Sequence, residues 1–173
     1  MRKYAGEVWR HVPKGSFALH VGYLLKASGR WNRRGEYACI YTAFSRDGAI
    51  AEYAKMLKSA ALSPADAEKR DLVTIKINLS PILDLGTEKT RRRLSVTKTQ
   101  LIGDNPRDFE LCRSIADFAR SEGYTAIRSP SAAKKKEYNL NIYFDGKASN
   151  IDITDGTLRE PLNYGSGLTK YFV

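Results

Sequence analysis

The stretch DLVTIKINL at residues 71–79 constrains the fold of this chain more than any other part of the sequence. Val73, Ile75, Ile77 and Leu79 alternate with polar neighbours, which is the pattern of a strand with one buried face. A single strand cannot satisfy its backbone hydrogen bonds alone, so partner strands are required. The sequence predicts them over 7–12, 38–44, 124–130 and 138–144.

Helices are expected between these strands. Ser45 and Asp47 offer caps for a helix over about 46–60, and Asp108 offers one for a helix that ends near 121, before Gly123. Shorter helices are predicted at 17–26 and 87–93. Beyond Gly146 the periodicity is too weak to predict a helix or a strand. Strands and helices scattered in this way favour an α+β fold with a sheet at its core.

Composition limits the class of protein. The chain has 173 residues and a net charge of +10, from 29 Lys+Arg against 19 Asp+Glu. This length suits one domain over residues 1–173. The sequence has no apolar run long enough to span a membrane, no secretory pattern near Met1 and two isolated cysteines, so a cytoplasmic location is expected.

The positive charge favours anionic partners but does not choose among nucleic acids, nucleotides and acidic proteins. Its two densest runs, Arg91–Arg93 and Lys134–Lys136, are consistent either with solvated charge or with docking of an anionic partner. Neither run is interleaved with aromatic residues, and no helix-turn-helix or RNA-recognition pattern is present. Direct nucleic-acid binding is therefore disfavoured.

Several common catalytic signatures are absent. The sequence contains no phosphate-binding P-loop, no H-E-x-x-H zinc motif, no G-x-S-x-G elbow and no G-x-G-x-x-G dinucleotide fingerprint. Two histidines and two separated cysteines do not make a zinc site, so no metal is predicted.

A set of polar residues in unusual positions remains. Arg10 lies inside an apolar strand, Arg30 opens the loop GRWN, and Tyr41 lies within the apolar segment ACIYTAF. Glu52 lies off the apolar face of its helix, which fits a solvated residue and a residue facing a cleft equally well. Ser131 follows Pro130 after a predicted strand.

These residues fall in five short motifs that occur in order along residues 7–146. The motifs are WRH (9–11), GRWN with Gly35 (29–35), IYTA (40–43), AIAE (49–52) and IRSPSA with NLNIYF (127–144). Each is weak alone, but together they resemble the RES-domain family, bacterial toxins that consume NAD+.

The resemblance implies a fold like that of ADP-ribosyltransferases, with a bent, split, mixed β-core flanked by short helices. It implies that Arg10, His11, Arg30 and Tyr41 bind NAD+, with Tyr41 at the nicotinamide end. Glu52, Arg30 and Ser131 would form the catalytic centre, where Glu52 and Ser131 also contact the cofactor. His11 stands where the family often has tyrosine, and Ala43 and Arg33–Arg34 also depart from the expected pattern.

The chemistry of these side chains suits that role. Arginine forks match phosphate oxygens, and an aromatic face attracts the cationic nicotinamide ring. A carboxylate at Glu52 would stabilise the oxocarbenium-like sugar formed when the glycosidic bond breaks, while Ser131 would position groups.

Each residue also has a plainer interpretation. Arg10 and Arg30 are consistent with surface charges, Tyr41 with a packed core residue, and Ser131 with a turn cap. Asn139 and Asn141, which alternate in one strand, are interpreted as structural.

The leading hypothesis is a toxin that degrades NAD+ at the nicotinamide–ribose bond, with water or phosphate as acceptor. The family implies a cognate Xre-type antitoxin that blocks the cleft, with a homodimer within the complex left open. One alternative is a mono-ADP-ribosyltransferase that modifies a protein or nucleic acid. Another, of a different class, is a non-catalytic basic module that binds nucleic acid or a protein partner.

Overall fold

The computed structural model describes residues 2–19, 24–65, 67–143, 151–162 and 167–172. The strands are β1 (Arg2–Pro13), β2 (Cys39–Ala43), β3 (Arg70–Asp84), β4 (Ala126–Pro130), β5 (Tyr138–Tyr143) and β6 (Ile151–Leu162). The helices are α1 (Arg46–Ser59), α2 (Glu88–Arg93), α3 (Lys98–Ile102) and α4 (Pro106–Ser121), with a short 3₁₀ helix η2 (Thr169–Tyr171).

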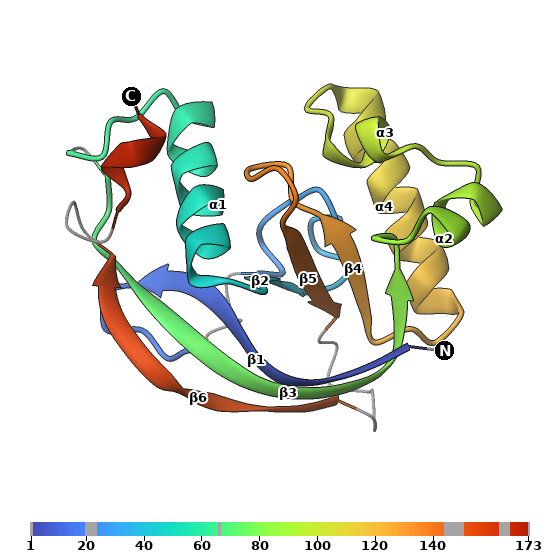
Figure 1. Cartoon of the computed structure of the whole chain (residues 1–173), viewed down its shortest axis with the longest axis horizontal. Coiled ribbons are helices and arrows are strands. Elements are labelled where there is room, and N and C mark those ends of the chain that lie inside the picture. The colour runs from blue at the N-terminus through green and yellow to red at the C-terminus, as the bar shows by residue number, and fades with distance from the viewer. Residues whose placement is uncertain (1, 20–23, 66, 144–150, 163–166, 173) are drawn as a thin grey trace.

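The strands close into a small mixed barrel. β1 pairs with β2 on one side and β3 on the other, and the ring continues from β2 through β5 and β4 back to β3. The β3–β4 pairing is parallel, whereas the other pairings are antiparallel. β6 adds to β3 outside the ring. Figure 1 shows α1 on one side of the molecule and α2, α3 and α4 on the other, above the curved strands β1, β3 and β6. The predicted α+β class with a bent mixed β-core is confirmed.

β3 is the longest of the described strands, and it contains the alternating segment at 71–79. Ile75, Ile77 and Leu79 are buried while Lys76 and Asn78 are exposed, as the alternation predicts. The strand does not end at Leu79 but continues past Pro81 to Asp84, where it pairs with β4. β3 therefore joins the long curved strands to the β4–β5 half of the barrel.

The two longer helices lie where they were predicted. Ser45 caps α1, since its hydroxyl accepts a hydrogen bond from the Gly48 amide at 2.9 Å. α4 begins three residues earlier than expected, because its cap is Asn105 rather than Asp108. The Asp108 amide donates to the Asn105 side chain at 2.9 Å.

Other predictions were wrong. The described part of 17–26 contains turns rather than a helix, and residues 20–23 lie outside the described residues. This segment is apolar because Ala18 and Leu24 fill the barrel core, not because a helical face repeats. α3 was not predicted, and β6 occupies a tail that showed only a weak pattern. No described helix has the length and apolar character needed to cross a membrane.

Candidate active site

A cavity of about 360 Å³ lies between α1 and the barrel, where residues from β1, β2, β3 and β5 meet. Its volume is within the range of small-molecule sites. Four predicted site residues line it, namely Arg10, His11, Tyr41 and Glu52. Segments separated by more than 40 residues in the sequence are thus brought to one place.

Glu52 projects from α1 and is held by two neutral donors. The Ser131 hydroxyl donates to Glu52 Oε1 at 2.7 Å, and the Asn139 side-chain amide donates to the same oxygen at 2.5 Å. A carboxylate only accepts hydrogen bonds, so the Asn139 atom that faces it is the NH₂ group. These two bonds anchor one oxygen of the carboxylate to the barrel.

Ser131 is positioned by a tight turn after β4. Its hydroxyl oxygen accepts hydrogen bonds from the amides of Ala133 at 3.1 Å and Lys134 at 3.0 Å. With both lone pairs used, the hydroxyl proton is directed to Glu52. Ser131 is therefore both a turn cap and a partner of Glu52, so the two interpretations of this residue are compatible.

Two guanidinium groups give the cavity positive charge. Arg10 is only 4% exposed and lines the cavity from β1. Arg70, at the start of β3, lines it as well, and its Nη1 lies 3.3 Å from His11 Nδ1. Arginine only donates, so Nδ1 of His11 is the acceptor.

His11 is a neutral ring in this site. Burial, together with the positive charges of Arg70 and Arg10, lowers its pKa from 6.5 to about 3. The ring packs against Tyr53, with 4.9 Å between centroids. His11 therefore offers an apolar face and no charge near neutral pH.

Tyr41 is fixed by the loop that carries the GRWN motif. Its hydroxyl donates to Asn32 Oδ1 at 2.8 Å and accepts from the Trp31 amide at 2.9 Å. Burial raises the pKa of this phenol well above 10, so it stays neutral. Gly29 is required beside it, because a Cβ there would lie 2.1 Å from the Tyr41 hydroxyl oxygen.

Arg30 does not line this cavity, although the neighbouring Gly29 does. Its guanidinium lies 4.5 Å from the centre of the Phe109 ring and donates to the carbonyls of Leu101 at 3.2 Å and Gly103 at 2.6 Å. It also forms an ion pair with Asp104 at 2.8 Å. The structure thus groups five of the predicted residues and places the sixth at the connection between α3 and α4.

Sequence reasoning missed Arg70 and the contact that Asn139 makes with Glu52. Asn139 carried a signal, since a polar residue alternates with apolar ones in β5, but that pattern was interpreted as structural. Arg70 stands just before the alternating segment, and nothing in its surroundings in the sequence distinguishes it from a surface charge.

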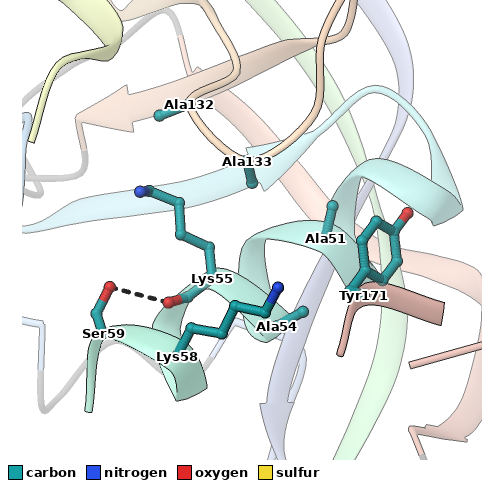
Figure 2. Close-up of a pocket in the computed structure, with 8 residues that line it drawn as sticks. All are labelled: Ala51, Ala54, Lys55, Lys58, Ser59, Ala132, Ala133 and Tyr171. Atoms are coloured by element: carbon teal, nitrogen blue, oxygen red, sulfur yellow. Dashed lines mark hydrogen bonds between the residues drawn. The ribbon is translucent and has the colours of Figure 1, made fainter. Parts of the chain in front are cut away.

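A second cavity, also of about 360 Å³, lies on another face of α1 (Figure 2). Four alanines line it, together with Lys55, Lys58, Ser59 and Tyr171. Figure 2 shows Lys55 and Lys58 diverging from α1, with Ala132 and Ala133 opposite. None of the predicted site residues lines this cavity, so chemistry rather than size distinguishes the first one.

Within the described part of the chain, no three His, Cys, Asp or Glu side chains come together as a metal site. The first cavity instead combines a carboxylate held by hydrogen bonds, two guanidinium groups and a buried phenol. Such a set suits a substrate with anionic groups and a centre that gains positive charge during reaction.

Comparison with protein families agrees with this arrangement. The family profile of the RES domain matches residues 7–163. The chain belongs to the RES domain family. This range includes β6, which lies beyond the motif-bearing part at 7–146.

Two relatives extend the comparison. A protein of Mycobacterium tuberculosis named "Probable NAD(+) phosphorylase" is 26% identical over 160 residues, covering 92% of this RES domain chain and 74% of the relative. A chain in the crystal structure of the M. tuberculosis MbcT–MbcA toxin–antitoxin complex has the same fold, with a TM-score of 0.76 at 16% identity. That match covers 98% of this chain and 88% of the other.

Proposed function

We propose that this RES domain breaks the bond between nicotinamide and ribose in NAD+ and transfers the ADP-ribosyl group to phosphate, or to water when phosphate is absent. The observation that carries the proposal is the placement of Glu52, which Ser131 and Asn139 hold at the wall of a cavity shared with Arg10 and Tyr41. Phosphate is favoured as acceptor because the curated relative is named a phosphorylase.

The reaction needs stabilisation of positive charge on the sugar. As the bond from ribose C1 to the pyridinium nitrogen breaks, its electron pair leaves with neutral nicotinamide and the ribose gains oxocarbenium character. Glu52 is the carboxylate in the cavity that can stabilise this charge. An oxygen of the phosphate dianion then bonds to C1 and completes the transfer. When water is the acceptor instead, it also gives up a proton, which Glu52 can accept.

The remaining residues would bind and orient the substrate. Arg10 and Arg70 supply fixed positive charge for the phosphates of NAD+. The ring of Tyr41 lines the cavity while its hydroxyl is occupied by the loop, so it would act through its aromatic face rather than as an acid. Neutral His11 adds a second flat surface without repelling the cationic nicotinamide.

The match to a chain of a toxin–antitoxin complex supports a further part of the proposal. The RES domain would act as the toxin, in the cytoplasm where NAD+ is abundant, and an antitoxin with an Xre-type domain would cover the opening of the cavity. Growth would stop as NAD+ is consumed.

The test is a product analysis with the purified chain. Incubation with NAD+ is expected to release nicotinamide, with ADP-ribose 1-phosphate formed in phosphate buffer and ADP-ribose without phosphate. Glu52→Gln keeps an acceptor for Ser131 and Asn139 but removes the charge, so we expect nicotinamide release to fall by roughly a hundredfold or more. Glu122→Gln, an exposed glutamate after α4, is the matched control and should keep wild-type activity.

Two results would contradict the proposal. Intact NAD+ after prolonged incubation, with and without phosphate, would show that the cavity does not serve this reaction. Transfer of label from NAD+ to a protein or nucleic acid, with no free ADP-ribose product, would favour a mono-ADP-ribosyltransferase instead.

A further inference from the structure

The side chain of Asp104 bridges two elements that lie on opposite sides of the molecule. Asp104 belongs to the connection between α3 and α4, and Figure 1 shows these helices across from α1. One carboxylate oxygen accepts from Arg30 Nη2 at 2.8 Å, and the other forms an ion pair with Lys55 of α1. A single anion is thus held between two cations that come from different segments.

The exposure of the three side chains is unequal. The Asp104 side chain is 58% exposed, whereas Arg30 is 11% exposed and Lys55 is 28% exposed. The anion can therefore rotate into water at little cost, while the two cations remain in place.

Arg30 does not depend on the carboxylate for its position. Its Nη1 donates to the backbone carbonyls of Leu101 and Gly103, and its planar group stacks over Phe109. Nη2 is the nitrogen that Asp104 uses, so rotation of that one side chain would expose a donor that is already oriented.

Lys55 lines the second cavity rather than the first, but it lies close to Glu52 on α1. It follows Glu52 by three residues on α1, and residues at this spacing are neighbours on a helix surface, about 5–6 Å apart at Cβ. That is the scale of one sugar, which is what separates the reacting ribose carbon from the nearer phosphate of a dinucleotide.

We propose that Arg30 and Lys55 form a subsite for a phosphoryl group, which the carboxylate of Asp104 occupies until a ligand displaces it. The inference rests on the proposed function and adds a binding role for Lys55 and Asp104. The phosphoryl group belongs either to the pyrophosphate of NAD+ or to inorganic phosphate as acceptor. Both present phosphate oxygens that match the guanidinium fork, so either can replace Asp104.

Three variants test the subsite. Asp104→Asn removes the competing charge and should lower the KM for NAD+ or for phosphate by up to about fivefold. This limit follows because an exposed ion pair contributes roughly 1 kcal/mol. Lys55→Gln should raise the same KM by about tenfold. Lys58→Gln removes a lysine one turn further along α1 that lies over the Phe172 ring instead, and it should leave KM unchanged.

Measuring KM separately for NAD+ and for phosphate identifies the ligand. A change confined to NAD+ assigns the subsite to the pyrophosphate, and a change confined to phosphate assigns it to the acceptor. If Asp104→Asn leaves both KM values unchanged, or raises them while lowering the melting temperature, Asp104 only stabilises the fold and the inference is wrong.

Binding measurements separate this inference from the proposed function. In the Glu52→Gln background, ADP-ribose and inorganic phosphate are titrated calorimetrically, so no turnover is needed. Tighter binding of either probe after Asp104→Asn, and weaker binding after Lys55→Gln, would support the subsite even if the wild-type chain did not cleave NAD+. Equal binding by all three proteins would overturn it even if cleavage were observed.

Discussion

Single side chains in this site perform two tasks at once, and Ser131 is the clearest example. Two backbone amides donate hydrogen bonds to its oxygen, so its hydroxyl proton is donated to the Glu52 carboxylate. The shape of the turn after β4 is therefore coupled to the orientation of the carboxylate on α1. Sequence motifs identified both residues, but the direction of the Ser131 proton follows only from the folded turn.

His11 provides a prediction at this scale. Its pKa is about 3 in the folded chain and returns to the ordinary 6.5 on unfolding, so the unfolded chain binds more protons between these pH values. The stability this residue contributes is complete above pH 6.5 and is lost as the pH falls toward 3. One proton gives a slope of at most about 1.4 kcal/mol per pH unit.

His11→Phe should remove this share of the acid sensitivity. We expect the loss of unfolding free energy between about pH 7 and pH 4.5, measured by urea titration, to be smaller in the variant than in the wild type. Identical losses in the two proteins would mean that His11 accepts a proton in the folded state.

At the scale of elements, the strands and the two longer helices could be predicted because their patterns are local. Ser45 and the alternation in β3 each determine an element through neighbours in the sequence. The segment 17–26 could not be predicted correctly, because its apolar residues are required by a barrel core made by distant strands. The same reason applies to Arg30, whose direction depends on the α3–α4 connection more than 70 residues away.

The loop between Gly29 and Asn32 yields a prediction about an element. Gly29→Ala would place a Cβ 2.1 Å from the Tyr41 hydroxyl oxygen and 2.8 Å from Asn32 Oδ1, so the loop or the tyrosine must move. We expect a loss of about 1–3 kcal/mol in the free energy of unfolding. Chemical denaturation measures this directly.

A double-mutant cycle with Tyr41→Phe tests the cause. Removal of the hydroxyl relieves the shortest contact, while the ring carbon Cζ at 2.8 Å remains, so Gly29→Ala should cost less in the Tyr41→Phe background than in the wild type. If the two effects simply add, the glycine is needed for a reason other than its contact with Tyr41.

At the scale of the whole molecule, the motifs end near residue 146 but the fold does not. β6 pairs with β3 from Leu79 back to Arg70, and Leu162 and Leu168 pack in the core beside α1. The weak pattern of this tail reflects a strand bound along one side of β3 with many exposed residues. β6 covers the edge of β3 that β1 leaves free, and this pairing depends on the folded sheet rather than on any local pattern in the tail.

Truncation tests the importance of this tail. A chain that ends at residue 146 lacks β6, leaves the long edge of β3 open, and should lose its cooperative thermal transition, measured by circular dichroism. A chain that ends after Tyr171 retains β6 and η2 and should keep the transition. Cooperative melting of the shorter chain would show that the motif-bearing segment folds alone.

The arrangement of the strands also affects whether copies of this protein aggregate at high concentration. Because β6 adds to β3 outside the ring, its outer side is a long strand edge that the described structure leaves without a strand partner. That edge strand carries a register shift opposite Val73 and Ile75, the exposed residues Asp152 and Asp155, and a proline at Pro161 that cannot donate a hydrogen bond. Such features prevent strands of neighbouring molecules from adding in register, and so protect a barrel of this kind against aggregation.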